Sequence, residues 1–228
     1  MTVIARIRTE FPEKFGIPRQ SGLVNTRGTV VFEPPFRRPE ALRGLEGFSH
    51  IWLLWQFSEA VREEWSPTVR PPRLGGNTRM GVFATRSPFR PNPIGLSSVR
   101  LLGIRHDEEL GDVLEVEGAD LMDGTPIYDI KPYLPYTDSH PEARDGFAGE
   151  REGYALSVEI PEEWAEALPP EKMTALRQVL AQDPRPSYQE DGERVYGMSF
   201  AGAAVRFTVA AGRLTVREIR PGGEEEIL

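Results

Sequence analysis

HIWLLWQF, at residues 50–57, is the stretch that decides the fold class of this chain. It is eight residues long, almost wholly apolar and aromatic, and too short to cross a membrane as a helix. Such a run predicts a β-strand, and its lack of alternation predicts burial on both faces. Runs rich in β-branched and aromatic residues predict further strands at 3–8, 29–33, 79–86, 94–105 and 113–121.

No amphipathic helix of useful length separates these runs before residue 140. Strands that follow one another without crossover helices pair in antiparallel sheets, and about six of them can close into a barrel. The sequence therefore predicts a mainly β protein with a small antiparallel β-barrel over residues 1–137. Residues 138–153 are polar, charged and turn-rich, which predicts a linker.

Residues 154–228 predict a small α+β module. Prolines followed by acidic residues mark helix starts at 161 and at 169–170. Leu176, Val179 and Leu180 mark one face of the helix. Three strands are predicted, at 194–200, 204–210 and 213–220, with Ala211–Gly212 turning the last hairpin.

Several classes of site are disfavoured by residue types that the chain lacks. It has no cysteine, so disulfides and thiolate metal sites are excluded. Its three histidines have no metal-binding spacing, which predicts no metal, and no P-loop or G-x-G-x-x-G turn is present. Residues 1–10 lack the apolar run of a signal peptide, so we expect a cytoplasmic protein without a membrane span.

Charge is distributed unevenly along the chain. The net charge is −8, which alone argues against nucleic acid, yet residues 65–106 contain no aspartate or glutamate. The same stretch holds seven arginines, at 70, 73, 79, 86, 90, 100 and 105, and no lysine. Arginine binds phosphate through paired hydrogen bonds and stacks on bases. We therefore expect an anion-binding surface here, against the alternative of an ordinary solvated face.

The elbow GVFATRSPFRPNPIGLS, residues 81–97, connects two of the predicted strands. Its three prolines, at 88, 91 and 93, force an extended path and remove N–H donors. The elbow thereby presents Arg86 and Arg90 as rigid cations suited to carboxylate or phosphate. The alternative is a barrel corner whose arginines pair with the protein's own acids.

Three other motifs allow a functional and a purely structural interpretation. RPPRLGGN places Arg70 and Arg73 on a stiff spacer, or is simply a proline-rich loop. His50 at the start of the 50–57 strand is a ligand contact or a core histidine. DLMDGTPIYDIKPYLPY, residues 120–136, offers carboxylates beside a lysine and a tyrosine, or is a hairpin with solvated aspartates.

Together these motifs resemble the TsaA-like (YaeB/TrmO) family of tRNA methyltransferases. The resemblance extends from about residue 4 to residue 188 and is carried by PRQSG (18–22), RGLEGFSHIW (43–52), RPPRLGGN (70–77), the elbow (81–97), DLMDGTPIYDIKPYLPY (120–136) and LAQDPRPSY (180–188).

The resemblance implies a barrel that binds S-adenosylmethionine without a Rossmann fold and pairs as a homodimer, with the cofactor near the dimer interface. The implied reaction is methylation of N6 of threonylcarbamoyladenosine (t6A) at position 37 of the tRNA anticodon arm, giving m6t6A, in threonine-decoding tRNAs. The C-terminal module resembles one that helps to hold tRNA.

Residues are assigned from the matching motifs. For the cofactor they are Pro18, Arg19, Gln20, His50, Arg86, Leu96, Asp120, Leu121, Met122 and Asp123. With tRNA as the partner, the phosphate contacts expected are Arg70, Arg73, Arg79 and Arg90.

Methyl transfer to a urea-like nitrogen removes a proton from that nitrogen, so a general base can help. The candidates are Asp129, Lys131 and Tyr133. Two alternatives remain open at this point. One is a methyltransferase with a different acceptor, and the other is an RNA-binding module that binds S-adenosylmethionine without catalysis.

Overall fold

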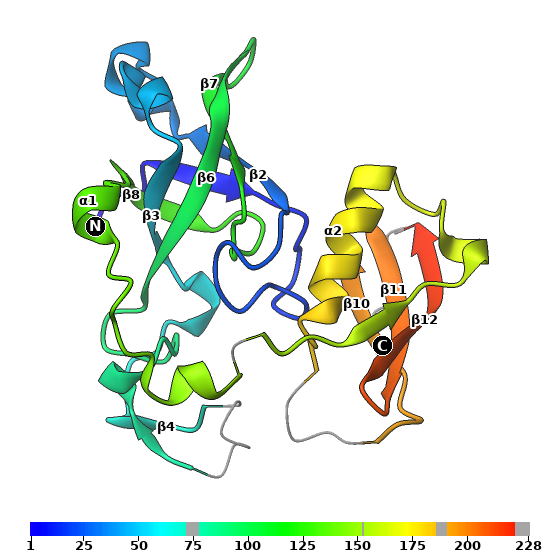
Figure 1. Cartoon of the computed structure of the whole chain (residues 1–228). Helices are drawn as coiled ribbons and strands as arrows, with labels where there is room; N and C mark the ends of the chain where they lie inside the picture. Colours follow the sequence, from blue (N-terminus) through cyan, green and yellow to red (C-terminus); the bar gives the residue numbers. More distant parts are fainter. Residues whose placement is uncertain (72–77, 152, 186–190, 222–228) are drawn as a thin grey trace.

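The computed structural model describes residues 1–71, 78–151, 153–185 and 191–221. The N-terminal part is a closed barrel in the order β1-β2-β7-β6-β3-β8, in which neighbouring strands are antiparallel (Figure 1). Its strands are β1 (Ala5–Arg8), β2 (Arg27–Phe32), β3 (His50–Gln56), β6 (Ile94–Asp107), β7 (Gly111–Glu117) and β8 (Pro126–Pro132). The predicted mainly β class and antiparallel barrel are confirmed.

Strand β3 shows how the barrel is filled. Ile51, Leu53 and Trp55 alternate along it and are buried inside the barrel, as the period of two requires. Trp52 and Leu54 face outward and are only partly buried. The prediction of burial on both faces is therefore wrong. Apolar side chains occupy the outer face as well, where Trp52 borders a cavity outside the barrel.

The prediction of a strand at 79–86 is also wrong. Only Met80–Gly81 extends, as β5, and it pairs with the short β4 (Thr68–Val69). A 3-10 helix follows at Val82–Ala84, because Thr85 Oγ1 donates to Val82 O over 2.9 Å and closes a local turn. A threonine that bonds to nearby backbone in this way competes with the strand ladder.

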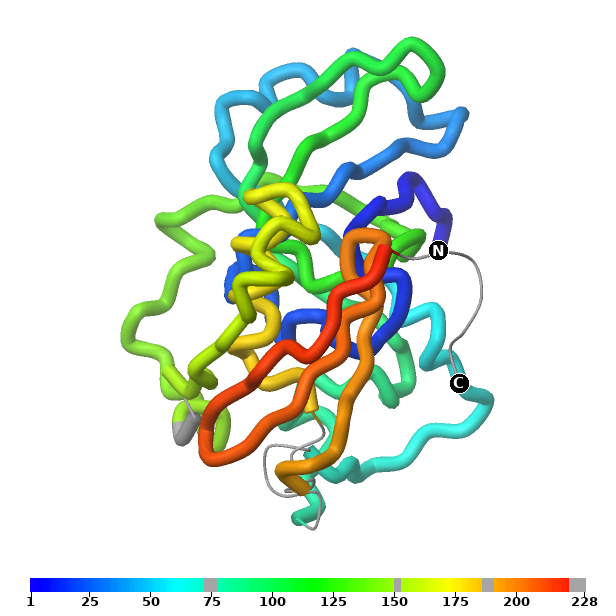
Figure 2. Tube along the Cα trace, turned by 90° about the vertical axis from the view of Figure 1, so that its right-hand side faces the viewer, coloured from blue at the N-terminus to red at the C-terminus, as the bar shows by residue number. Residues whose placement is uncertain are grey.

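The C-terminal part is a second sheet, in the order β10-β11-β12-β9, packed against helix α2 (Pro170–Ala181; Figures 1 and 2). Its strands are β9 (Ser157–Glu159), β10 (Tyr196–Phe200), β11 (Ala203–Ala210) and β12 (Arg213–Pro221). The predicted Ala211–Gly212 turn has positive φ at both residues, as a two-residue hairpin of this kind requires. Sequence missed β9, whose three residues, paired parallel to β12, are too few to show a period.

The two sheets are joined by the chain between β1 and β2. Phe11 is fully buried in the core of the C-terminal sheet, with its ring centroid 5.6 Å from that of Phe200. Glu10 accepts a hydrogen bond from the backbone N–H of Ala201 and forms an ion pair with Lys172 of α2. The segment that connects β1 to β2 in the barrel thus supplies Phe11 to the core of the C-terminal sheet.

The described residues of the predicted linker, 138–151 and 153, contain no strand. The linker follows the short helix α1 (Pro135–Asp138) and includes a 3-10 helix at Gly146–Arg151. Within the described parts of the chain, no helix is long and apolar enough to cross a membrane. The domain limits at 137 and 154 remain predictions.

We predict that Phe11→Ala costs about 3–5 kcal/mol of the free energy of unfolding, because it removes a buried aromatic ring and leaves a cavity. The measurement is urea unfolding followed by circular dichroism. Phe36→Ala is the matched control, since Phe36 lies partly exposed in a 3-10 helix without buried residues. Equal losses in both variants would contradict a joining role for Phe11.

Candidate functional site

A cavity of about 820 Å³ lies mainly against the outer surface of β3 and β6, and the inward-facing Trp55 and Gly95 also line it. Its volume is within the range of small-molecule sites, about 300–1,000 Å³. Its walls come from stretches far apart in sequence, namely residues 14–21, the chain after β3, and the elbow. The barrel supplies a rigid floor, and the irregular segments supply most of the polar groups.

The barrel wall is mainly apolar. Strands β3 and β6 are antiparallel and place Gln56 opposite Ile94 and Trp52 opposite Ser98 on the outer face. Leu96 lies between these pairs and is 56% exposed. Leu96 therefore borders the cavity, as the prediction of a cofactor contact requires. A flat apolar wall of this kind can pack against an aromatic ring.

The second wall contains Pro18, Arg19 and Gln20, all three of them predicted cofactor residues. Arg19 Nη2 donates to the backbone oxygen of Asp183 over 2.8 Å, so the C-terminal module helps to fix this wall. Gln20 Oε1 accepts a hydrogen bond from Arg86 Nη1 of the elbow. The structure thus brings together residues that are 66 positions apart.

The elbow forms the third wall and is held by its own hydrogen bonds. Arg90 Nη1 donates to Thr85 O over 3.1 Å, and the backbone N–H of Ile94 donates to Asn92 O over 2.7 Å. Pro93 O accepts from the N–H of Phe57 over 2.8 Å, which ties the elbow to the end of β3. Arg86 and Arg90 both line the cavity, as the rigid-elbow interpretation predicts.

Asp120 brings a carboxylate to the cavity, beside Met122. Ser97 Oγ donates to Asp120 Oδ1 over 2.5 Å, and Trp55 Nε1 donates to Ser97 Oγ over 2.9 Å. Burial raises the pKa of Asp120 above its usual range, while the hydrogen bond from Ser97 and the charge of Arg86 act against that rise. An ionised Asp120 is therefore a desolvated anion next to the cavity.

Sequence reasoning missed Ser97 and Trp55. The signal that could have found Ser97 is its position on β6, where Gly95, Ser97, Val99 and Leu101 alternate inward. A hydroxyl at an inward position of an otherwise apolar strand needs a partner. That partner belongs to a motif 23 residues later in the chain, so the contact itself could not be predicted.

Three predicted cofactor residues do not line the cavity. His50 is exposed and its Nδ1 lies 2.9 Å from Ser49 Oγ. Leu121 is fully buried in the barrel core. Asp123 Oδ1 accepts from the backbone N–H of Thr9 over 2.9 Å and shapes the chain after β1. A role for these three in cofactor binding stays a prediction.

Asp129, Lys131 and Tyr133 lie on or just after β8 and also do not line the cavity. Lys131 Nζ is 3.2 Å from Asp129 Oδ2, and both side chains are partly exposed. Lys131 pairs with Trp52 in the β3–β8 register, and the Tyr133 ring centroid lies 5.5 Å from that of Trp52. The group therefore adjoins the cavity through Trp52.

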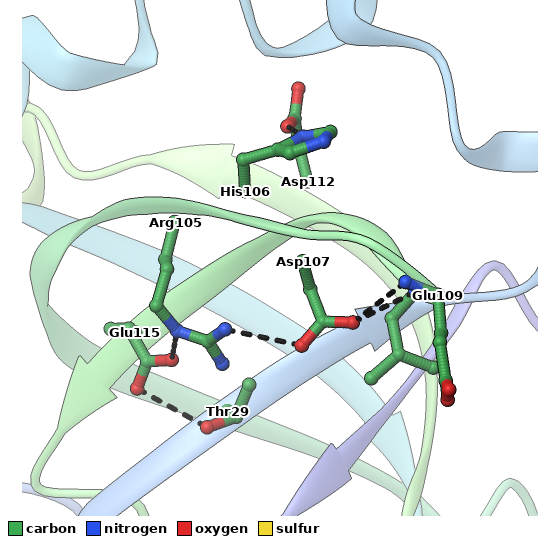
Figure 3. Close-up of polar contacts among 8 residues, drawn as sticks. Thr29, Arg105, His106, Asp107, Glu109, Asp112 and Glu115 are labelled. Atoms are coloured by element: carbon green, nitrogen blue, oxygen red, sulfur yellow. Dashed lines mark hydrogen bonds and ion pairs between the residues drawn. The ribbon is translucent and has the colours of Figure 1, made fainter.

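The acid-free stretch is not one continuous cationic strip. Arg100 and Arg105 lie on β6 and pair with carboxylates of β7, with Arg100 Nη1 3.4 Å from Glu117 Oε2 and Arg105 Nε 2.9 Å from Glu115 Oε1. Figure 3 shows the Arg105 cluster, in which Asp107 Oδ2 also accepts over 3.2 Å. The hydrogen bond to Glu115 raises the pKa of Arg105. Arg100 and Arg105 thus pair with the protein's own carboxylates.

The predicted tRNA-contacting arginines are placed differently. Arg70 and Arg79 are exposed, and Arg90 is partly buried in the cavity wall. Arg73 lies outside the described residues. In the described part of the chain, no group of three or more histidine, cysteine or acidic side chains could hold a metal ion.

Family models match nearly the whole chain. One described as the tRNA-methyltransferase O N-terminal domain matches residues 6–139, and one described as the TrmO C-terminal domain matches residues 154–222. A curated Escherichia coli K12 protein named tRNA (adenine(37)-N6)-methyltransferase is 42% identical over 228 residues, which is 96% of each chain. A Pseudomonas aeruginosa protein named putative S-adenosylmethionine-dependent methyltransferase RcsF is 48% identical, covering 86% of each chain.

Solved structures agree with these matches. A structure described as the crystal structure of TrmO from Pseudomonas aeruginosa has a TM-score of 0.75 at 38% identity, covering 96% of this chain and 98% of that one. Another, described as the crystal structure of TrmO, has a TM-score of 0.76 at 38% identity, covering 96% of this chain and all of that one.

We predict that Gly95→Ala destabilises the fold by about 1–3 kcal/mol, because a Cβ there would overlap the indole ring of Trp55. Thermal unfolding measures the loss, and tryptophan fluorescence reports the displaced ring. Gly103→Ala is a matched control on the same strand, since an added Cβ there meets no atom within 4 Å. A melting temperature as high as that of the control would show that the ring moves away freely.

Proposed function

The chain belongs to the tRNA-methyltransferase O family, and we propose on that premise that it is an S-adenosylmethionine-dependent tRNA methyltransferase. Methylation of N6 of adenosine 37 is the activity named for its Escherichia coli relative. We propose further that the substrate base already carries the threonylcarbamoyl group, so that the reaction converts t6A to m6t6A in threonine-decoding tRNAs.

The observation that carries the proposal is the charge arrangement of the cavity. Arg86 provides a guanidinium and Asp120 a carboxylate beside an apolar wall. S-Adenosylmethionine has a carboxylate, an ammonium group, a sulfonium and an aromatic base, so this set of residues fits it. When bound, it supplies an electrophilic methyl group. Arg86 would hold the carboxylate through a charge-assisted hydrogen bond.

The protein's part in the reaction is positioning and proton removal. Asp129 and Tyr133 are the candidates for accepting a proton, with Lys131 next to Asp129 at 3.2 Å. Tyr133 contacts Trp52, which lines the cavity, and Lys131, the ion-pair partner of Asp129, lies opposite Trp52 in the β3–β8 register. An acceptor base that enters beside Trp52 would reach both candidates.

We propose that the chain pairs as a homodimer through the outer face of β6. Ile94, Leu96 and Leu102 are large apolar side chains of this strand that remain exposed. Exposed apolar groups along one strand face favour burial by a partner. A second copy on this face would bring its own residues next to the cavity.

We propose that the tRNA anticodon arm lies along the exposed arginines near the elbow. Arg70 and Arg79 are exposed there, and Arg90 borders the cavity. Guanidinium groups neutralise phosphates and release counterions. The C-terminal module, which holds Arg19 through Asp183, would support the bound tRNA. Because the substrate is tRNA, we place the reaction in the cytoplasm.

The experiment that tests the function uses methyl-labelled S-adenosylmethionine and two preparations of threonine tRNA. One preparation carries t6A at position 37 and the other is an unmodified transcript. We expect label only in the first, with m6t6A identified by mass spectrometry of nucleosides. Label in the unmodified transcript would show a wrong acceptor, and no label in either would favour a binding module without catalysis.

We predict that Asp129→Asn or Tyr133→Phe lowers the single-turnover rate by about 10²–10⁴-fold, the usual contribution of a general base. Affinity for S-adenosylmethionine, measured by calorimetry, should stay close to that of the unchanged protein. Tyr136→Phe is the matched control, because Tyr136 is 86% exposed on α1. Parallel losses of rate and affinity would exclude the base role and indicate cofactor binding instead.

A further inference from the structure

The side chains of Trp55, Ser97 and Asp120 form a hydrogen-bonded chain at the wall of the cavity, which Trp55 and Asp120 both line. Trp55 and Ser97 are almost fully buried, at 5% and 1% exposure. The indole N–H can only donate, so Ser97 Oγ must accept from it. The hydroxyl proton of Ser97 is then free to point at Asp120, which favours the ionised carboxylate.

The position of Trp55 is itself fixed by packing. Gly95, two residues before Ser97 on β6, has no side chain, and the Trp55 ring occupies the space that a Cβ would fill. The Trp55 ring also makes an edge contact with Phe57, at a centroid distance of 4.2 Å. Because the Trp55 ring is held on both sides, its N–H stays aimed at Ser97. Core packing therefore fixes the donor-to-acceptor direction of the Trp55–Ser97–Asp120 hydrogen bonds.

Asp120 differs from the other acidic group at the cavity. Glu59 Oε2 lies 4.0 Å from Lys14 Nζ, which balances its charge. Arg86 donates to Gln20, and no ion pair joins it to Asp120 within the described residues. Asp120 therefore faces the cavity as a partly desolvated carboxylate without a cation at ion-pair distance. A cationic ligand would restore part of the solvation that folding removed.

We propose that Trp55 and Ser97 are positioning residues that hold the Asp120 carboxylate toward the cavity, and that this carboxylate makes the site prefer a sulfonium ligand over its neutral thioether counterpart. The proposal rests on the proposed function, which supplies S-adenosylmethionine as the ligand. S-Adenosylhomocysteine has the same carboxylate, ammonium, ribose and base but no charge on sulfur. The site would thus bind the product more weakly than the cofactor and favour its release.

The test is calorimetric titration of S-adenosylmethionine and S-adenosylhomocysteine between pH 4.5 and 8. The other charged groups around the cavity are Lys14, Arg19, Glu59, Arg86 and Arg90. Burial raises the pKa of Asp120, and a transition that Asp120→Asn removes is assigned to this carboxyl. Affinity for the sulfonium should rise as pH increases through that transition, while affinity for the thioether should change little.

Asp120→Asn should remove the transition and lower the ratio of the two affinities by about tenfold or more, because an opposite charge within about 4–6 Å shifts a pKa by 1–3 units. Ser97→Ala should move the transition to higher pH, since the lost hydrogen bond no longer favours the anion. Trp55→Phe keeps an aromatic ring but removes the N–H donor to Ser97, and it should move the transition in the same direction by a smaller amount. Thr208→Ala, which removes a buried hydroxyl of the C-terminal sheet, should leave the pH of the transition unchanged.

The outcomes separate the two proposals. If the unchanged protein binds neither compound, the proposed function fails. If it binds both and Asp120→Asn weakens them equally, the carboxylate contacts a shared group and the charge preference is overturned. If Ser97→Ala keeps the transition of the unchanged protein, the positioning role is overturned, and melting temperatures of all variants show whether each one folds.

Discussion

The interior of a six-stranded barrel is filled by the side chains of its own strands, and this constraint determines where the protein can bind anything. Ile51, Leu53 and Trp55 fill that space together with the inward residues of the other strands. The cavity accordingly lies mainly against the outer face of β3 and β6, where the inward-facing Trp55 and Gly95 also line it. Trp52, Leu96 and Ile94 are apolar on that face for this reason, and the irregular segments around them supply the charges.

The connection between β1 and β2 serves both halves of the molecule. Phe11 and Val24 are buried with the C-terminal sheet, while Pro18, Arg19 and Gln20 between them border the cavity. One short segment thus packs into the core of the C-terminal sheet and also positions residues that line the cavity. The hydrogen bond from Arg19 to the backbone of Asp183 makes the same connection from the other side.

Much of this arrangement could be predicted from local sequence. The lack of a long amphipathic helix before residue 140 predicted the barrel, and the prolines of the elbow predicted that Arg86 and Arg90 are held rigidly. The errors arose where tertiary contacts override local pattern. Thr85 turns the chain at Val82 instead of extending it, and β9 is a strand only because β12 lies beside it. The Ser97–Asp120 contact joins β6 to the loop after β7, a pairing that sequence spacing does not indicate.

The shared core also limits how the chain can be shortened. A fragment that ends before residue 154 would lose the sheet that covers Phe11 and Val24, two side chains that are almost fully buried in the whole chain. They would then lie on the surface of the isolated barrel, next to the segment that carries Arg19. Such a fragment would tend to aggregate through this newly exposed patch unless polar residues replace both side chains.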